Sequence, residues 1–339
     1  MINIISRSVA SSLTSGPQKV ATNLIKGLDI LGYPYCINKA LDSTSELWIH
    51  DDQIALKEAS KLKLKAVVGP NLYILPRNIP SDIDLSNFLY IHPSDWAVKI
   101  WQDFGYNRST ITSWPVGINT DEFDERQKPE DGTVLIYFKQ RYPEELEYIK
   151  SILEKNNIKY DVISYRFYKQ KDYLEKLKNT KYLVWLGRQE SQGIALQEAL
   201  SMNVPMLVWD VTNMGHWVPT EKESKIFTEE ELSYPATSAP FFSEQCGKIS
   251  KNKSEIETLV KEMEKDWRNF EPRKYIVENL SLVKQARDFI KLFETHCGIS
   301  YEAGLNEKLK NTNNWRNAEW YMKVFFFIKD SAKKILQKY

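Results

Sequence analysis

Short apolar runs alternate with amphipathic segments along most of this chain, and the alternation occurs twice, on either side of a charged segment. Parallel strands need a crossover between them, usually a helix, so this pattern is typical of βα units in a parallel sheet. In the first half we expect strands at residues 2–5, 35–37, 47–49, 66–68, 88–91 and 110–114, and helices at 18–31, 53–61 and 95–104. In the second half we expect strands at 134–138, 160–164, 182–186 and 206–209, and helices at 144–156, 169–179, 193–201, 254–267 and 280–295.

The charged segment 126–131, which contains Pro129, predicts a linker between the two series. The predicted fold class is therefore α/β, with two Rossmann-like domains whose parallel sheets face each other across a cleft. The first domain is expected at 1–125 and the second at 132–297.

Residues 298–339 differ in character and predict a helical extension, because apolar and aromatic side chains such as Trp320 and Phe325 recur near one helical face among lysines. Two interpretations stay open. The helix packs back on the first domain, or it lies on an anionic membrane surface as a peripheral contact.

Composition excludes several classes of protein. The net charge of +1 argues against a general nucleic-acid binder, which would need many cations to neutralise phosphates. The 3 cysteines, at positions 36, 246 and 297, are too widely spaced for a metal site and indicate reduced thiols. The amino-terminal apolar run is too short for a signal peptide, and no apolar run has the length of a membrane span. We therefore expect a cytoplasmic protein.

The segment from the strand at 182–186 to the strand at 206–209 contains the strongest functional signal. Gly193, Ile194 and Ala195 begin a helix directly after a polar turn, and free backbone N–H groups at such a terminus bind anions without a metal. Glu190 lies in the turn and Glu198 lies about one helical turn into the helix. Because strand ends and the following helix starts meet at one edge of a parallel sheet, both carboxylates are expected at one crevice. Such a pair suits a hydroxyl-rich ligand, a sugar or a ribose.

The sequence ESQGIALQEALSMNVPMLVWD, which begins at Glu190, resembles the E-x7-E signature of retaining GT-B glycosyltransferases, in particular the large family four. Three other segments resemble parts of the same family in the same order. They are SGPQKVATNLIKGLDILGY near the amino terminus, WPVGINTDEF before the linker and LVKQARDFIKLFE at the end of the second domain. The resemblance covers about residues 2–297.

This resemblance implies a GT-B fold and a hexosyltransferase-like enzyme that moves a sugar from a nucleotide-diphosphate donor, a UDP-sugar or GDP-sugar, to an acceptor hydroxyl. The configuration of the sugar is expected to be retained, and neither a metal nor a cofactor is expected. The acceptor would be a glycan or a lipid-linked molecule. The enzyme would take part in polysaccharide biosynthesis. The resemblance also implies that Glu198 binds the ribose diol and that Glu190, as a catalytic residue, contacts the donor sugar.

The chain departs from the family where the second domain opens. The family usually has a strand that ends in Gly-Arg and a later Lys-Gly pair, whereas this sequence reads VLIYFKQRYPEE. We expect Lys139 and Arg141 to hold the donor diphosphate instead, since negative charge grows there in the transition state. In the first loop only Gly16 remains of the family's paired glycines, and we expect it on the donor side.

Further candidates follow expected strands. His92 is a catalytic candidate that would hydrogen-bond the donor sugar or the acceptor hydroxyl, and Tyr165 is expected beside the nucleotide base. On the acceptor side we expect His50, Asp51 and Asn71. Each of these residues also has a structural interpretation, such as a buried histidine with satisfied hydrogen bonds.

Three other functions remain open from the sequence. One is a nucleotide-sugar epimerase on the same fold, and another is a non-catalytic module that binds a sugar or a nucleotide. The third is a scaffold at a lipid surface that uses the terminal helix.

Overall fold

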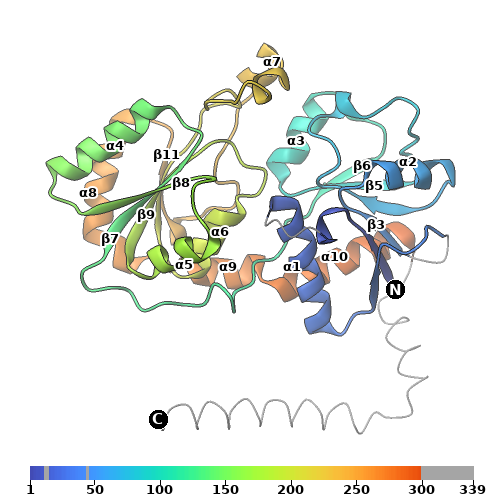
Figure 1. Ribbon diagram of the computed structural model, residues 1–339, viewed down its shortest axis with the longest axis horizontal. Helices are drawn as coiled ribbons and strands as arrows, with labels where there is room; N and C mark the ends of the chain where they lie inside the picture. The colour runs from blue at the N-terminus through green and yellow to red at the C-terminus, as the bar shows by residue number, and fades with distance from the viewer. Residues whose placement is uncertain (11–14, 43–45, 299–339) are drawn as a thin grey trace, which may run out of the picture. The chain divides into compact units, whose positions relative to one another are not determined.

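A computed structural model describes residues 1–10, 15–42 and 46–298 (Figure 1). Met1–Phe289 form one compact unit, and this unit contains two parallel sheets. The predicted α/β fold class is confirmed. The extension at 298–339 lies outside the described residues except for Gly298, so both interpretations of it stay predictions. No helix within the described ranges combines the length and the apolar character that a membrane span requires.

The first sheet has 6 parallel strands in the order β2-β1-β3-β4-β5-β6. The strands are β1 (Ile2–Ile5), β2 (Tyr35–Ile37), β3 (Glu46–Ile49), β4 (Ala66–Val68), β5 (Phe88–His92) and β6 (Thr110–Ser113). The helices α1 (Gly16–Leu31), α2 (Gln53–Lys61) and α3 (Asp95–Asp103) connect them. Each of these helices starts at a residue whose side chain accepts a backbone N–H of the first turn: Ser15, Asp52 and Ser94.

Both faces of the first sheet are covered, which explains why its central strands consist mostly of apolar residues. On one face, α2 and α3 pack on β3, β4 and β5 in a single cluster of buried side chains. On the other face, Trp48 of β3 lies edge-on to Trp114 and Phe289, the latter from α10 (Leu282–Cys297).

The second sheet has 5 parallel strands in the order β11-β10-β9-β7-β8. The strands are β7 (Thr133–Lys139), β8 (Tyr160–Ser164), β9 (Thr180–Gly187), β10 (Met206–Trp209) and β11 (Gly247–Ser250). The helices α4 (Pro143–Lys155), α5 (Gln170–Lys178), α6 (Ile194–Ser201), α8 (Ile256–Asp266) and α9 (Pro272–Leu280) pack around this sheet, and the short α7 (Glu229–Ser233) lies apart from it. The predicted linker, 126–131, lies between β6 and β7.

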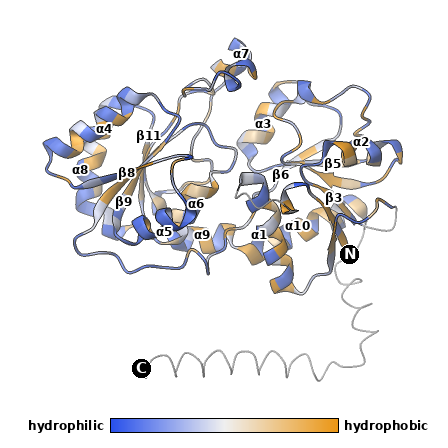
Figure 2. Cartoon of the chain, in the orientation of Figure 1, coloured by the Kyte–Doolittle hydropathy of each residue, from blue (hydrophilic) through white to orange (hydrophobic). Residues whose placement is uncertain are grey.

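Side chains of β7 alternate between the two faces of this sheet. Val134 and Ile136 pack with α4 and α8, whereas Leu135 and Tyr137 pack with α5, α6 and α9. In Figure 2 the strands are predominantly hydrophobic, while the helices around them also carry hydrophilic residues. The sheet is therefore the middle layer of three, and polar side chains can gather only at its edges.

In each sheet the first strand of the chain has its two successors on opposite sides. β1 lies between β2 and β3, and β7 lies between β8 and β9. At such a switch point the loops at the carboxyl ends of neighbouring strands diverge and leave a crevice for a ligand. The loop after β9 contains Glu190 and the β7 strand ends at Lys139, so the sheet order itself brings these two residues to one crevice.

The strands and helices expected from the sequence are confirmed, with ends that differ by no more than about two residues, an ordinary uncertainty for such boundaries. The sequence did not reveal β11, α7 or α9. The strand β11 lies at the edge of its sheet, and Ile249 is 44% exposed, so it lacks the continuous apolar pattern of a buried strand.

Gly27 allows α1 to approach the start of α10 closely. A Cβ added at this position would lie 2.7 Å from the carbonyl oxygen of Leu282 and 2.8 Å from the Cβ of Ala286. We expect Gly27→Val to lower the free energy of unfolding by about 1–3 kcal/mol, because a buried backbone contact cannot yield without moving the helix. Urea denaturation would measure the loss. Gly16→Ala on the same helix is the control, since an added Cβ there meets no atom within 4 Å. Equal stability of the two variants would contradict this packing.

Candidate active site

A cavity of about 660 Å³ lies at the carboxyl ends of β7 and β9. It is lined by several residues that the sequence predicted for a donor site: Gly16, Lys139, Tyr165, Glu190, Gly193, Ile194 and Ala195. Asn71, which was predicted on the acceptor side, also lines it. The structure thus brings most of the predicted residues to one place.

Lys139 and Glu190 form an ion pair in this cavity. The Nζ of Lys139 donates to Oε1 of Glu190, and their side chains are only 12% and 16% exposed. Lys139 is the last residue of β7 and lies opposite Gly187 in the register with β9. The turn that follows is held by backbone bonds, including one from Glu190 N to Thr237 O of 3.0 Å. The pair is therefore fixed by the sheet and its first turn.

The amino terminus of α6 opens into the same cavity. Gly193 precedes the helix with φ +80°, a left-handed conformation that favours glycine, and no side chain caps the helix. An added Cβ at Gly193 would have no neighbour closer than 3.8 Å, so the backbone conformation and not the packing requires a glycine. The uncapped N–H groups, together with Lys139, form an environment suited to a diphosphate.

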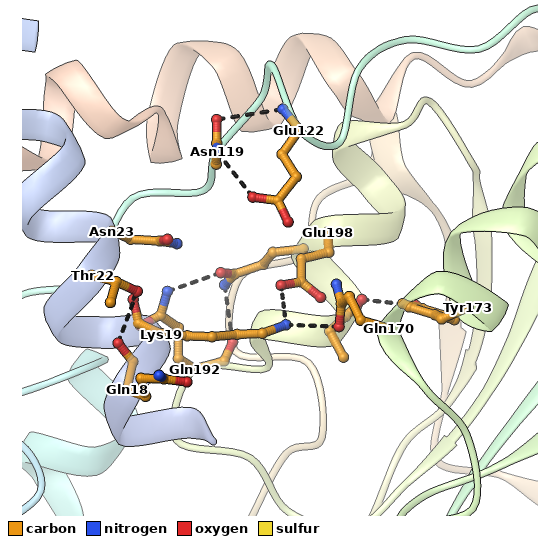
Figure 3. Close-up of polar contacts among 12 residues, drawn as sticks. Gln18, Lys19, Thr22, Asn23, Asn119, Glu122, Gln170, Tyr173, Gln192 and Glu198 are labelled. Atoms are coloured by element: carbon orange, nitrogen blue, oxygen red, sulfur yellow. Dashed lines mark hydrogen bonds and ion pairs between the residues drawn. The ribbon is translucent and has the colours of Figure 1, made fainter. Parts of the chain in front are cut away.

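Glu198 lies behind the cavity surface and is almost completely buried. Lys19 of α1 donates to Oε1 of Glu198, and its Nζ also lies 3.3 Å from Oε1 of Gln170 (Figure 3). Burial raises the pKa of Glu198, while the charge of Lys19 opposes this rise. Lys19 and Gln170 line the cavity, so a ligand that reaches Glu198 must share it with Lys19.

Aromatic rings form one wall of the cavity. Tyr137 stacks on Trp185 with 4.4 Å between ring centroids, and its hydroxyl lies 2.8 Å from that of Tyr168. Tyr165 lies beside two cations, with the Nζ of Lys139 4.5 Å and the guanidinium of Arg166 5.4 Å from its ring centroid. A planar group such as a nucleobase could stack on rings of this kind.

Several lining residues were not found from the sequence. Lys19 could have been, because it lies one helical turn after Gly16 in a segment that carries the family resemblance. Gln192 offers no such signal: its amide accepts from Val116 N at 3.1 Å and donates to Val116 O at 2.8 Å. These two bonds join the E-x7-E turn to the segment WPVGINTDEF, which is far away in the sequence.

The structure places Arg141 inside the protein and not among the described residues that line the first cavity, and its predicted contact with the diphosphate stays a prediction. Its side chain is completely buried and donates to both oxygens of Glu145, at 2.8 and 2.7 Å. It also donates to the carbonyl oxygens of Gly187 at 3.2 Å and Trp209 at 2.8 Å. The guanidinium therefore donates its hydrogen bonds to groups inside the protein. It connects the ends of β7, β9 and β10 to α4.

His50 and Asp51, which were predicted on the acceptor side, bind neighbouring backbone groups in the structure, and their contact with an acceptor stays a prediction. His50 is completely buried, its Nε2 lies 3.0 Å from the carbonyl oxygen of Pro17, and burial lowers its pKa. Asp51 accepts the backbone N–H groups of Arg7 at 2.7 Å and Ser8 at 3.0 Å. Both residues shape the loop after β1, and neither is among the described residues that line the cavities.

A second cavity of about 500 Å³ shares Asn71, Pro93, Glu190 and Ser191 with the first. His92 lines this second cavity, and its Nε2 is buried without a hydrogen-bond partner among the described residues. Burial lowers the pKa of His92 to about 3, so its imidazole is neutral at neutral pH. Glu190 lines both cavities and therefore lies where they meet.

No family model matches the sequence, and no match was found among curated proteins. Solved structures do match. A sucrose-phosphate synthase from Thermosynechococcus elongatus has a TM-score of 0.55 and 10% identity, over 88% of this chain and 99% of that one. The apo form of the lipopolysaccharide outer core galactosyltransferase WaaB has a TM-score of 0.50 and 11% identity, over 87% and 99%. A chain of the GtfA/B complex is longer, since the match covers 82% of this chain and 60% of that one at a TM-score of 0.45.

The likenesses to the sucrose-phosphate synthase and to WaaB, together with the two parallel sheets, define the class of fold. The protein has the GT-B fold, as the sequence resemblance implied.

The buried position of Arg141 predicts a structural role. Burial raises the pKa of Glu145, but hydrogen bonds from His216 and Arg141 outweigh it and bring the value from 4.5 to about 2. We expect Arg141→Met to lower the free energy of unfolding by about 3–5 kcal/mol at neutral pH, since it leaves a buried carboxylate without its main partner. In the wild type this contribution is complete above pH 4.5 and is lost as the pH falls toward 2, and urea denaturation across that range would show it.

The exposed Lys155 provides the control, because Lys155→Met should change stability by no more than about 0.5 kcal/mol. Unchanged stability of Arg141→Met, with a loss of nucleotide affinity, would restore Arg141 to the ligand site.

The Lys19–Glu198 pair leads to a pH-dependent prediction. Lys19→Met should lower the free energy of unfolding by about 2 kcal/mol at neutral pH, because Glu198 would be buried without a cation. The pKa of Glu198 would rise further, so the variant should lose stability as the pH increases above 4.5, the ordinary value. The double variant Lys19→Met/Glu198→Gln should regain most of the lost free energy of unfolding. A loss that is independent of pH and persists in the double variant would contradict a charge effect.

Proposed function

We propose that this protein is a retaining, metal-independent glycosyltransferase that moves a sugar from a nucleotide-diphosphate donor to an acceptor hydroxyl. The observation that carries the proposal is the Lys139–Glu190 pair beside the uncapped start of α6, in a cavity at the switch point of the second sheet. The fold is shared with solved glycosyltransferases, and the cavity supplies a cation, helix amides and a carboxylate for the three parts of such a donor.

The donor diphosphate would bind at the start of α6. The free N–H groups after Gly193 and the ammonium of Lys139 both favour an anion there. When the bond between the sugar and the diphosphate breaks, negative charge grows on the leaving phosphate. Groups that are already in position stabilise that charge without reorganisation.

Glu190 would contact hydroxyls of the donor sugar and stabilise the positive charge that develops at the anomeric carbon. It lies within hydrogen-bond distance of Lys139, so the two residues act on opposite charges of one breaking bond. We propose attack by the acceptor hydroxyl on the same face, with its proton taken up by the leaving phosphate. Glu190 then has a supporting electrostatic role and forms no covalent intermediate.

Glu198 would accept the hydroxyls of the ribose, in exchange for part of its interaction with Lys19. Tyr165 would lie beside the base, supported by its exposure to the cavity next to Arg166. Gly16, at the start of α1, would let the donor approach the first sheet's loops, since no atom fills the space beside it.

The acceptor would enter through the second cavity, toward Asn71 and the neutral imidazole of His92. A neutral imidazole can accept or donate one hydrogen bond and thereby orient a hydroxyl. We propose a glycan or a lipid-linked acceptor and a cytoplasmic role in the biosynthesis of polysaccharides. A peripheral membrane contact through residues 298–339 stays a prediction.

Exchange of the two charged partners tests the proposed roles. Lys139→Met should reduce both the affinity for UDP or GDP and the turnover, the latter by about 10²–10³-fold, because it removes a cation from the leaving group. Glu190→Gln should reduce turnover by a similar factor and leave nucleotide affinity nearly unchanged. Calorimetry would report the affinity, and transfer from a panel of UDP-sugars and GDP-sugars would report the turnover.

Lys155→Met is the matched control for a lost lysine, and thermal unfolding would verify that each variant is folded. Full transfer activity in Lys139→Met/Glu190→Gln would sink the proposal. A changed donor in the absence of any acceptor would point to an epimerase. Nucleotide binding without turnover of any donor or acceptor would point to a binding module.

A further inference from the structure

Among the residues that the structure describes, the second cavity has a largely apolar wall and one cation, Arg188. Its wall includes the half-buried rings of Tyr73, Trp96 and Phe227 and the side chain of Ile74, which is 54% exposed. A wall of this kind with few polar groups is typical of a small-molecule site. The polar groups on it therefore indicate which ligand it selects.

Arg188 is the cation of this cavity. It lies two residues before Glu190, and its backbone N–H is bound to Lys139 O at 3.0 Å, so its position is fixed by β7. Its guanidinium lies 4.8 Å from the ring centroid of Trp217. Within the described ranges the side chain makes neither an ion pair nor a hydrogen bond, and its Nε is buried without a partner.

The neighbouring charges are engaged elsewhere. Lys139 binds Glu190, and Arg77 binds Glu231 through two hydrogen bonds. Glu223, the other carboxylate on the cavity wall, accepts from Gln140 Nε2 at 3.0 Å and from Thr220 Oγ1 at 2.8 Å.

Burial raises the pKa of Glu223, but the hydrogen bonds to it and the charge of Arg188 lower the pKa overall, so Glu223 is ionised at neutral pH. Arg188 thus interacts with Glu223 only through its charge, and none of its side-chain N–H groups donates a hydrogen bond within the described ranges. A buried, unsatisfied donor is costly unless a ligand accepts from it.

We infer, on the basis of the proposed transferase function, that the second cavity binds an anionic saccharide as the acceptor. Arg188 binds its carboxylate or phosphate, because the planar guanidinium offers paired donors that match such a group. One face of the sugar ring packs on Trp96 and Tyr73. Since Arg188 and Glu190 both line the cavity, a hydroxyl near the anionic group then lies next to the reacting donor sugar.

A matched set of three probes tests the inference: a neutral methyl hexoside, the methyl uronoside of the same hexose and its 6-phosphate. Calorimetry with the full chain should show at least one of the two anionic probes binding about tenfold more tightly than the neutral one, the least that a charge-assisted hydrogen bond would give. The uronoside and phosphate arms distinguish the two sources of charge.

Arg188→Gln should abolish this preference, and Arg188→Lys should keep part of it, since the charge remains while the paired donors are lost. Lys155→Gln, which removes an exposed cation outside both cavities, should leave it unchanged. The affinity of Arg188→Gln for UDP or GDP should match that of the wild type, because Arg188 does not line the first cavity among the described residues.

Equal binding of the three probes, no binding of either anionic probe, or a preference that survives Arg188→Gln would each overturn the inference. A loss of nucleotide affinity in Arg188→Gln would overturn it too, since the residue would then serve the donor. The proposed function fails separately, when no nucleotide-sugar binds or reacts. Transfer to neutral acceptors alone would leave that function standing and remove only the anionic acceptor.

Discussion

The buried guanidinium of Arg141 is the interaction on which the candidate site depends. It lies two residues after Lys139 and donates to Glu145 and to the carbonyl oxygens that end β9 and β10. A fully buried charge is tolerated only when a partner and additional hydrogen bonds satisfy it. Arg141 meets this condition with groups from three different elements. The turn between β7 and α4 is therefore held in place, and Lys139 projects from a fixed strand end into the first cavity.

Each carboxylate of the E-x7-E segment has its own lysine. Glu190 is paired with Lys139 from the same sheet, and Glu198 is paired with Lys19 from α1, after the first strand of the other sheet. Both carboxylates are thus paired before a ligand binds, while Arg166 and Lys169 add further positive charge to the wall of the cavity. In the proposed function, a nucleotide diphosphate would compete with Glu190 for Lys139, and a ribose would compete with Lys19 for Glu198. The binding energy of such a donor would then be the difference between its contacts with the protein and the two ion pairs that it replaces.

Most strands and helices could be predicted from the sequence, because the periodicity of apolar residues indicates which side chains are buried. Strands such as β1, β4 and β8 are short apolar runs, and their order in the chain indicated two sheets. The edge strand β11 was not found because its one large apolar side chain, Ile249, is exposed and the strand has no apolar run. The position of a polar residue directly after a strand predicted its function less well than apolar periodicity predicted the strands. His50 and His92 occur in similar sequence contexts, yet one binds the carbonyl oxygen of Pro17 and the other lines a cavity. The sequence placed both at the sheet edge, but it does not specify the direction of either side chain.

The sequence by itself determined the α/β class, the two sheets, and the position of Glu190, Gly193 and Lys139 at the carboxyl ends of strands. These features are local, since each depends on a run of neighbouring residues. The tertiary structure alone decided which cations serve the cavities. Arg141 and Lys139 are two residues apart, but Arg141 is paired with Glu145 inside the protein, whereas Lys139 faces the cavity. Lys19 and Arg188 are held by contacts with residues that are distant in sequence, Lys19 by Glu198 and Arg188 by Lys139. The energy of a charged side chain depends on the partners and the burial that the whole fold supplies, and no local pattern records them.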